Sequence, residues 1–598
     1  MLALRWCVAL LIFATLTAGE IKNKGWWKNA VFYQVYPRSF MDADDDGIGD
    51  LRGITDKLEH FKESGITAIW LSPIYASPMV DFGYDISDFR DIDSAYGTME
   101  DFENLTKKAK QLGVKVIMDL VPNHTSDEHD WFIKSFHGKG KYKDYYVWRE
   151  GKESNMKPPN NWISVFSGPA WTYNATRKLW YFHQFEYRQP DLNYTNPNVR
   201  MEMEEIIKFW LSKGIDGFRV DAIPHVYEKD GLPDEPRSND QQASERDYNY
   251  LDHIYTKDDP RTYDLIQSWR NLMDRWADEH NEEEKVILTE AYTNLKNTTK
   301  FYKYGSHVPF NFNFIVQANN NSGPEKFKEI IDSWVQEVPP GNSSNWVMGN
   351  HDRNRLATRY PNRADQMTML AMILPGVAVT YNGEEIGMED KSDITWEETQ
   401  DPQACNVDPN GNWKARSRDP VRTPFQWDDT KNAGFSKADK TWLPVHQNYK
   451  ELNLAKQKID PISHYKLYKS LTSLRNSSEV LKNGSLKTEI LNGNDVLAVI
   501  RQTDRQSVIL LINFQNEKSQ KVDISSYTGP GNNVTIYVSS IGSNMMWNSM
   551  AVSDNIMLPG RASVVLISML TKSGAAFLIV PIKLILSMAL FGLFKQMF

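Results

Sequence analysis

The sequence predicts an α/β protein whose main domain is a (β/α)₈ TIM barrel, with an inserted lid subdomain after strand 3 and a C-terminal antiparallel β domain. Three observations support this fold class. The chain has 598 residues, too many for one compact core, so several domains are expected. Short apolar, β-rich runs alternate with helical stretches as far as residue 381, and this alternation favours a parallel sheet. Carboxylate residues close several runs, which is where such barrels build active sites.

Eight apolar runs are the expected barrel strands. In chain order they span residues 30–36, 66–71, 114–120, 215–220, 286–289, 308–314, 346–348 and 377–381. Helices are expected between them at 99–112, 199–213 and 261–279. Eight parallel strands alternating with helices make up a (β/α)₈ barrel, so the sequence assigns residues 20–124 and 192–474 to it.

The connection between the third strand and the helix before the fourth is unusually long. It covers residues 125–191 and is rich in Trp, Gly, Pro and Asn. Loops of this length in a compact domain are usually functional or form small subdomains, so we expect a lid subdomain over the barrel mouth. After residue 474 the pattern changes to short alternating runs, which predicts a C-terminal β domain over 475–570. Its clearest strands are 496–501, 507–513, 534–538 and 563–568.

The N-terminal residues 1–19 have the composition of a secretory signal peptide. Arg5 supplies a positive charge, residues 6–16 are apolar, and 17–19 are the small residues that cleavage requires. We therefore expect a protein of the secretory pathway.

The C-terminal residues 571–598 predict a membrane tether. Residues 575–594 are nearly all apolar. The small residues 573–575 suit attachment of a GPI anchor, but the polar spacer that usually follows is almost absent. A single C-terminal transmembrane helix is the alternative, and the sequence leaves both open. Either one places the protein at the extracellular face of the plasma membrane.

Composition and sequons agree with this compartment. The formal net charge of −9 argues against a nucleic-acid partner, because phosphate binding needs a basic face. Removal of the signal peptide takes Cys7 with it and leaves Cys405 without an intramolecular partner, so core packing has to stabilise the fold. Eight N-x-S/T triplets are expected to carry glycans. Their asparagines are Asn104, Asn174, Asn297, Asn320, Asn342, Asn476, Asn483 and Asn533.

Two carboxyl groups at the ends of successive predicted strands suit the cleavage of a glycosidic bond. That reaction needs one carboxyl that donates a proton to the leaving oxygen and another that is ionised. Asp221 ends the run Gly-Ile-Asp-Gly-Phe-Arg-Val-Asp, and Arg219 points to the same face because it lies two residues earlier on the strand. The guanidinium is expected to keep Asp221 ionised as the nucleophile. Glu290 closes the next strand and is the expected general acid/base.

Two further segments complete a ring around these carboxyls. Asp119-Leu-Val-Pro-Asn-His124 ends the third strand, and Gly349-Asn-His-Asp352 ends the seventh. His124, His351 and Asp352 can hold sugar hydroxyls, and Asp352 is expected to help distort the sugar ring towards the transition state. A single one of these residues could be an ordinary strand-end polar group, but four such segments in this order indicate a glycosidase.

These segments and two longer ones resemble the α-amylase superfamily, glycoside hydrolase family 13. Gln189-Pro-Asp-Leu-Asn193 and the run from Ser417 to Trp427 are similar to signatures of its oligo-1,6-glucosidase and α-glucosidase branch, and the chain most resembles insect gut maltases and sucrases. Phe82 stands where Asn is common in bacterial members. The resemblance implies Asp221 as nucleophile, Glu290 as acid/base and Asp352 as transition-state stabiliser. It further implies a set of residues around the terminal glucose, namely Asp81, Tyr84, His124, Arg219, His351 and Arg418.

An acidic loop near the N-terminus predicts a structural Ca²⁺ site. Residues 42–50 carry carboxylates at alternate positions before a turn at glycine, and hard oxygen ligands suit Ca²⁺. No bidentate glutamate follows as in an EF-hand, and a solvated acidic turn is the alternative. The loop resembles the calcium loop of the family, which implies as ligands the side chains of Asp42, Asp44, Asp46 and Asp50 and the carbonyl of Ile48.

The expected substrate is a small glucoside with a terminal glucose. The long insertion and Arg418 favour a closed pocket, and Ala222 after the nucleophile leaves room for an α-1,4 linkage or for the fructosyl unit of sucrose. We therefore expect an exo-acting, retaining α-glucosidase of the maltase or sucrase type, with weak α-1,6 activity and with transglycosylation chemically available. The alternatives are an endo-acting α-amylase and a non-catalytic relative like the heavy chains of amino-acid transporters. The sequence does not decide between maltose and sucrose, the share of transfer, the oligomeric state or a receptor role.

Overall fold

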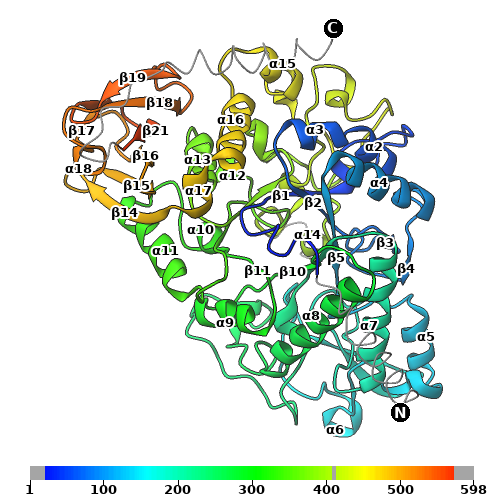
Figure 1. Ribbon diagram of the computed structural model, residues 1–598. Helices are drawn as coiled ribbons and strands as arrows, with labels where there is room; N and C mark the ends of the chain where they lie inside the picture. The colour runs from blue at the N-terminus through cyan, green and yellow to red at the C-terminus, as the bar shows by residue number, and fades with distance from the viewer. Residues whose placement is uncertain (1–20, 407–411, 571–598) are drawn as a thin grey trace, which may run out of the picture.

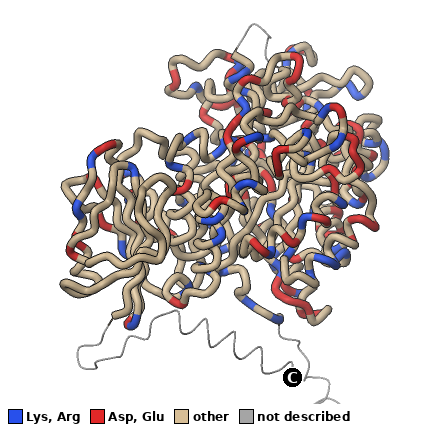
Figure 2. The backbone as a smooth tube through the Cα atoms, turned by 90° about the horizontal axis from the view of Figure 1, so that it is seen from above, with Lys and Arg blue, Asp and Glu red and all other residues tan. Residues whose placement is uncertain are grey.

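The computed structural model describes residues 21–406 and 412–570. The expectations for the signal peptide and for the C-terminal tether fall on residues outside these ranges. Among the residues described, no helix is both long enough and apolar enough to cross a membrane. Figure 2 shows acidic and basic residues mixed along the chain rather than gathered in separate regions.

Eight parallel strands form the centre of the molecule, which confirms the expected barrel (Figure 1). Around the sheet they follow the order β11, β10, β9, β5, β2, β1, β13, β12. Their bounds are β1 (Val31–Val35), β2 (Ala68–Leu71), β5 (Lys115–Leu120), β9 (Gly217–Val220), β10 (Val286–Thr289), β11 (Val308–Pro309), β12 (Asn345–Val347) and β13 (Val377–Tyr381). Nearly every side chain of these strands is buried, as expected for strands covered by packed residues on both faces.

A side chain closes the seam between the first and last strands of this order. Asn345 of β12 accepts a hydrogen bond from the backbone N–H of Asn311 at 2.7 Å and donates one to the carbonyl of Pro309 at 2.5 Å. Proline has no N–H to offer a neighbouring strand. The amide of Asn345 therefore joins β11 to β12 where a backbone ladder is interrupted.

Barrel helices match the sequence prediction closely, and one strand does not. Helices α4 (Met99–Leu112) and α8 (Arg261–Glu279) have the expected bounds, and α7 (Pro197–Ser212) begins two residues early. Thr98 caps α4 through a reciprocal capping box with Asp101, which fixes its start. The strand expected over 308–314 ends at Pro309, and the short helix α10 (Asn313–Val316) follows. The apolar run was misread as one strand because it continues through this turn.

The long connection after β5 contains its own small sheet. It has the antiparallel order β6 (Trp148–Arg149), β8 (Leu179–Phe182), β7 (Trp171–Asn174), beside the helix α5 (Asp130–Phe136). Isolated bridges tie its two ends together, between His124 and Asp191 and between Tyr146 and Leu192. The insertion is therefore anchored at the carboxyl end of β5.

A six-stranded antiparallel sheet follows the barrel, as expected. Its order is β14 (Ser485–Leu491), β15 (Val496–Gln502), β16 (Gln506–Asn513), β21 (Ser563–Met569), β18 (Asn533–Ser539), β19 (Ser549–Val552). It lies beside the barrel helices α11 (Pro324–Glu337), α13 (Ala364–Ile373) and α16 (His464–Ser477) (Figure 1). Buried Arg475 and Arg501 donate to carbonyls of residues 372–376, at the end of α13. These bonds satisfy carbonyls that a helix end leaves free.

Candidate active site

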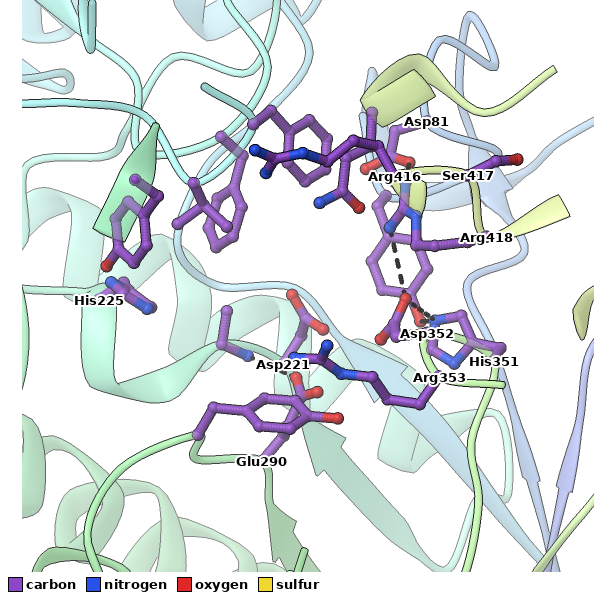
Figure 3. A pocket seen from close by; sticks show the side chains of 18 of the residues that line it. Asp81, Asp221, His225, Glu290, His351, Asp352, Arg353, Arg416, Ser417 and Arg418 are labelled. Carbon is purple, nitrogen blue, oxygen red and sulfur yellow. Dashed lines mark hydrogen bonds and ion pairs between the residues drawn. The ribbon is translucent and has the colours of Figure 1, made fainter. Parts of the chain in front are cut away.

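The carboxyl ends of the barrel strands open into a cavity of about 650 Å³. Its wall combines strand-end residues, aromatic residues of the insertion and a segment that follows β13 (Figure 3). The predicted site residues at this wall are Asp81, Tyr84, His124, Asp221, Glu290, His351, Asp352 and Arg418. Arg219 lies just beneath them and is almost fully buried. One cavity therefore gathers all nine residues predicted to catalyse or to bind the terminal glucose.

Arg219 is the charge that links the two predicted catalytic carboxyls. Its Nη1 lies 2.5 Å from Asp221 Oδ1, and its Nη2 lies 2.7 Å from Glu290 Oε2. Nη1 also donates to both oxygens of Asp119, at 2.8 and 2.9 Å. The spacing of Arg219 and Asp221 on one strand predicts the contact to Asp221. Because β5, β9 and β10 lie side by side, the guanidinium bridges three carboxyls from successive strands.

This crowding decides how protons are shared. The pKa of Asp221 is raised well above its ordinary value, because burial and the neighbouring Glu290 together outweigh the lowering effect of Arg219. Burial likewise raises the pKa of Asp119 to about 7 against the pull of Arg219. Two adjacent buried carboxyls repel each other when both are ionised, which favours one proton shared between them. A pair that holds one proton has the protonation count that a double displacement on a glycoside requires.

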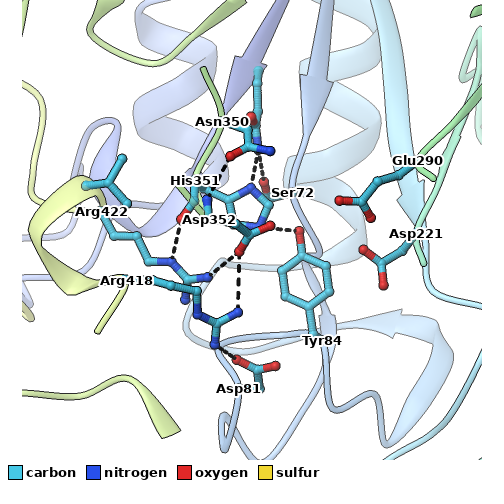
Figure 4. Close-up of polar contacts among 12 residues, drawn as sticks. Ser72, Asp81, Tyr84, Asp221, Glu290, Asn350, His351, Asp352, Arg418 and Arg422 are labelled. Atoms are coloured by element: carbon cyan, nitrogen blue, oxygen red, sulfur yellow. Dashed lines mark hydrogen bonds and ion pairs between the residues drawn. The ribbon is translucent and has the colours of Figure 1, made fainter. Parts of the chain in front are cut away.

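Asp352 occupies the opposite side of the cavity, in a strongly positive setting (Figure 4). Its Oδ1 lies 3.0 Å from Nη2 of Arg422 and 3.4 Å from Nη1 of Arg418. Burial alone would raise the pKa of Asp352, but the charges of Arg418 and Arg422 hold it well below its usual range. Asp352 is therefore a fixed negative charge at any physiological pH.

Arg418 connects Asp352 to the closed end of the pocket. Its Nη2 lies 2.7 Å from Oδ1 of Asp81. The other oxygen of Asp81 accepts from Nε2 of Gln189 at 3.3 Å, the first residue of the signature around Asp191. Oxygens and guanidinium hydrogens therefore alternate at this end, which suits the hydroxyls of a sugar because each hydroxyl both donates and accepts.

The neutral form of His351 is fixed by its neighbours. Burial lowers its pKa to about 3. The amide nitrogen of Gln34 lies 2.7 Å from Nδ1 and can only donate, so the hydrogen is on Nε2, which lies 2.8 Å from the hydroxyl of Tyr84. The ring of Tyr84 stacks on the imidazole with an interplanar angle of 5°. The one N–H of neutral His351 is therefore directed at the hydroxyl of Tyr84, and the ring is held in one orientation. Burial also keeps His124 neutral, since its pKa falls to about 4.

Sequence reasoning missed Asp401 and Arg422. Asp401 is fully buried and accepts from Arg418 at its backbone N (2.6 Å), Nε (3.0 Å) and Nη2 (2.6 Å). It precedes α14 (Pro402–Cys405) in the segment after β13 and follows no strand, so the strand-end rule could not find it. Arg422 lies inside the signature run from Ser417 to Trp427, which could have identified it.

Two loops meet above the pocket. The segment after β13 supplies Arg416, whose Nη2 lies 2.6 Å from Oδ1 of Asp247 in the loop that follows β9. The insertion supplies Phe166, and the guanidinium carbon of Arg418 lies 5.1 Å from the centroid of its ring. These contacts narrow one end of the cavity. A narrowed pocket suits the end of an oligosaccharide better than its middle.

The acidic loop near the N-terminus brings three of its predicted ligands together. Oxygen atoms of Asp42, Asp44 and Asp50 lie within 4.8 Å of one another. Asp46 is outside this cluster, and its Oδ1 accepts from the backbone N–H of Ile48 at 2.7 Å. Three carboxylates at this separation repel one another unless a cation lies between them, and an oxygen-only donor set suits Ca²⁺. The chemistry of the cluster therefore fits the predicted ion, without contact to the sugar pocket.

Burial separates the predicted glycan acceptors. Asn104, Asn342, Asn476, Asn483 and Asn533 are exposed, and Asn297 and Asn320 are partly so. Asn174 is only 4% exposed, and its side-chain oxygen accepts from the backbone of Thr176 and Arg177. A glycan on Asn174 would require this turn to open, so the expectation of an acceptor there is withdrawn.

The comparisons with known proteins agree with this geometry. The family model described as "Alpha amylase, catalytic domain" matches residues 34–484. The chain belongs to the α-amylase family. Maltase 1 of Drosophila virilis is 50% identical over 525 residues, covering 86% of this chain and 82% of that protein. The α-glucosidase of Apis mellifera is 44% identical over 554 residues, with 92% and 95% covered.

A solved structure of an α-glucosyl transfer enzyme is similar over most of the chain. It has a TM-score of 0.80 and 31% sequence identity, and covers 91% of this chain and 99% of its own. Membership of the α-amylase family, expected from the strand-end motifs, is thereby confirmed. The roles of individual site residues still rest on the geometry described above.

Proposed function

We propose that the protein is an exo-acting, retaining α-glucosidase that releases terminal glucose from maltose-like α-1,4 substrates and from sucrose. One observation carries the proposal: Arg219 bridges Asp221 and Glu290 at one side of a pocket whose other side holds Asp352 between two arginines. The similarity to a maltase and to an α-glucosidase over most of the chain supports the substrate class.

In the proposed reaction Asp221 attacks the anomeric carbon of the terminal glucose. Glu290 donates its proton to the leaving oxygen, and a covalent glucosyl–enzyme forms. Glu290, now ionised, then takes a proton from water, which attacks the same carbon and frees Asp221. Arg219 moves neither proton. It stabilises whichever carboxyl of the pair is negative at each stage.

Asp352, Asp81 and Arg418 would hold the hydroxyls of the same glucose. Because Asp352 remains ionised, it offers a negative charge to the positively charged ring of the oxocarbenium-like transition state. His351, through its N–H to the hydroxyl of Tyr84, would hold that hydroxyl in place at the wall of the pocket. These contacts are expected to strengthen as the ring flattens, which is how they would lower the barrier.

A substrate panel on the purified protein tests the activity. We expect release of glucose from maltose and sucrose, weaker release from isomaltose, and no early shortening of starch. Proton NMR of the first product should show α-glucose before mutarotation, since two displacements retain configuration. Initial β-glucose would contradict a retaining reaction. Rapid loss of starch viscosity would favour the endo-acting alternative, against which the narrowed pocket argues.

The structural Ca²⁺ site stays part of the proposal. Asp42, Asp44 and Asp50 would hold the ion, with Asp46 and the carbonyl of Ile48 as the further expected ligands. Added Ca²⁺ should raise the melting temperature, because an ion that binds only the folded state stabilises it. The variant Asp44→Asn should lose this shift, and Asp45→Asn, outside the cluster, should keep it. If neither Ca²⁺ nor EDTA changed the melting temperature, the proposed Ca²⁺ site would be contradicted.

Location and anchoring are proposals of the same kind. A protein with a cleavable leader and an apolar C-terminal segment would act at the extracellular face of the plasma membrane, and the exposed sequons agree with that route. Release of activity from membranes by a phosphatidylinositol-specific phospholipase would support a GPI anchor. Retention after this treatment, with release by detergent, would support a transmembrane helix instead.

A further inference from the structure

One face of the C-terminal β domain is apolar and becomes exposed where it extends beyond the barrel. Residues two apart on a strand share a face, and on β21 this face carries Val565, Ile567 and Met569. Val565 is fully buried in the core that the β domain shares with the barrel, Ile567 is partly buried, and Met569 is 68% exposed. The barrel therefore covers only the beginning of this face and leaves its end open.

Two neighbouring strands continue the open end of this face. β19 is the edge strand of the six-stranded sheet (Figure 1), and its Met550 and Val552 are 60% and 40% exposed. Met550 pairs with Thr535 of β18, and Val552 pairs with Asn533. Thr535 pairs in turn with Ile567 of β21, and paired residues point to the same side of a sheet. We refer to this open end as the distal face, which consists of Asn533, Thr535, Met550, Val552, Ile567 and Met569.

An exposed apolar face beside an edge strand favours unwanted association. An edge strand offers unpaired N–H and C=O groups to other chains, and contiguous exposed apolar surface adds to that tendency. Proteins commonly protect such edges with charged side chains, proline or a covering segment. None of the six residues of the distal face is charged or a proline, and four of them are apolar. Another group is therefore expected to cover this face.

The two polar residues of the distal face indicate what covers it. Asn533 and Thr535 lie on the middle strand, between the apolar residues of β19 and β21, and they begin and end an N-x-T triplet. Asn533 is exposed, and its side chain forms no hydrogen bond with any residue in 21–406 or 412–570. It is thus free to carry a glycan, whereas Asn174 is not.

The neighbours of Asn533 are apolar on both sides. Val552 of β19 pairs with it directly. On β21, Met569 lies two residues after Ile567, and Asn533 lies two residues before Thr535, the partner of Ile567. The antiparallel register therefore places Met569 beside Asn533 as well. A sugar attached to Nδ2 of Asn533 starts between two exposed apolar side chains. The faces of a pyranose ring carry C–H bonds and suit such a contact, while its hydroxyls remain in water.

We infer that the oligosaccharide on Asn533 packs against the distal face and shields the edge strand β19. This inference rests on the proposed secretory route and not on the sugar pocket, whose wall contains none of the six residues. The donor is a lipid-linked oligosaccharide diphosphate. Nδ2 of Asn533 loses one proton and bonds to the anomeric carbon, the bond from that carbon to the diphosphate oxygen breaks, and the lipid diphosphate leaves.

Hydrogen exchange followed by mass spectrometry tests the contact in the full-length protein from a secreting eukaryotic host. Asn533→Gln and Thr535→Val remove the glycan through different residues of the triplet. Each should speed amide exchange in β19 by about three- to tenfold, because local opening becomes easier when an apolar contact is lost. Unchanged exchange in both variants would overturn the inference.

Two matched variants control for the substitutions themselves. Thr535→Ser keeps an N-x-S triplet and therefore the glycan. Asn483→Gln removes an exposed acceptor at the end of α17 (Glu479–Asn483), beside β14 at the opposite edge of the sheet. Both should leave exchange in β19 at the wild-type rate. Faster exchange in β19 after Asn483→Gln would indicate a general effect of glycan loss and would contradict the proposed contact.

Removal of an apolar partner separates packing from mere attachment. In Met569→Ser the triplet is intact, but the glycan loses part of the surface that it contacts. Adding Asn533→Gln to Met569→Ser should therefore change exchange in β19 less than Asn533→Gln does alone. Equal changes would mean that the glycan does not pack on Met569, and the inference would be wrong.

Other occupants of the distal face would give different results. Exchange in β19 that slows with protein concentration would indicate a second copy of the chain, and slowing by phosphatidylcholine vesicles would indicate a lipid surface. Either result would overturn the inference, as would peptide mass spectrometry that found Asn533 unmodified. If Asn533→Gln is not secreted, the folded wild type can be trimmed enzymatically. Retention of the first N-acetylglucosamine should keep exchange slow, and complete removal should speed it; equal rates in the two forms would contradict the contact.

Activity distinguishes this inference from the proposed function. Asn533→Gln should keep the wild-type kcat/KM on maltose, because the distal face is not part of the pocket wall. A wild type that cleaved neither maltose nor sucrose would refute the proposed function, and the exchange rates would still decide the inference.

Discussion

The two sides of the pocket are built in different ways. On one side Asp119, Asp221 and Glu290 lie at the carboxyl ends of three adjacent strands, and Arg219 lies between them. On the other side Asp81, Arg418 and Asp401 come from loops. Asp81 and Arg418 are 337 residues apart in the sequence. The residues of the strand side are positioned by hydrogen-bonded neighbouring strands of the barrel. The loop side depends on how distant segments fold over it, which suggests that the first sets the chemistry and the second sets affinity.

The largest expected effect comes from the strand side. Asp221→Asn and Glu290→Gln should each lower kcat on maltose by about 10³-fold or more, by analogy with the loss of a nucleophile or acid/base elsewhere. Both keep the shape of the pocket, so KM should change far less. Steady-state kinetics on purified protein measure this.

Asp230→Asn is the control for these two variants, because Asp230 is an exposed aspartate of the loop that follows β9, with its side chain 82% exposed. It should have wild-type kinetics. An Asp221→Asn enzyme with most of its activity would refute the assignment of the nucleophile.

A smaller effect of a different kind is expected on the loop side. Asp401→Asn should raise KM by about tenfold, with a lesser fall in kcat, because a charge-assisted hydrogen bond to Arg418 is worth ~1.5–3 kcal/mol. Asp401 would act through Arg418 and touch no sugar. Asp393→Asn, on the same segment but paired with Lys391 and 61% exposed, should leave KM unchanged.

The comparison between the two sides is tested by whether a variant changes mainly kcat or mainly KM. If Asp401→Asn lowered kcat as much as Asp221→Asn and left KM alone, the loop side would share in the chemistry. The distinction drawn between the two sides would then be wrong.

The last expected effect is on stability, which both sides share, and not on catalysis. Burial lowers the pKa of His351 to about 3 and those of His124, His307 and His464 to about 4, from 6.5. These groups stay neutral in the folded protein but take up protons when it unfolds. The stability they allow is fully present above pH 6.5 and is lost as pH falls towards their folded values.

Each buried histidine should cost at most about 1.4 kcal/mol per pH unit below 6.5. Urea midpoints measured from pH 7.5 to 5 should therefore decline steadily. His307→Gln, far from the sugar pocket at the β10–β11 side of the barrel, should make the decline shallower. A midpoint that rose on acidification would contradict the neutral state of these rings.

Much of the molecule followed from local patterns. Seven of the eight expected strands, and the helices between them, were found from apolar runs, because buried parallel strands and amphipathic helices differ in period and composition. The eighth expected strand, at 308–314, was too long. The apolar run continues through the turn between β11 and α10, so hydrophobicity does not show where the strand ends. The strand-end carboxylates were also visible, since the barrel fixes where such ends meet.

The sequence by itself determined the fold class, the family and the residues that follow each strand. Only the tertiary structure decided that Arg219 bridges two catalytic carboxyls rather than serving one, that Asp401 holds Arg418, and that Asn174 is buried. The physical reason is distance along the chain: strand periodicity acts over a few residues, whereas charge sharing and burial depend on segments that only the folded barrel brings within a few ångströms.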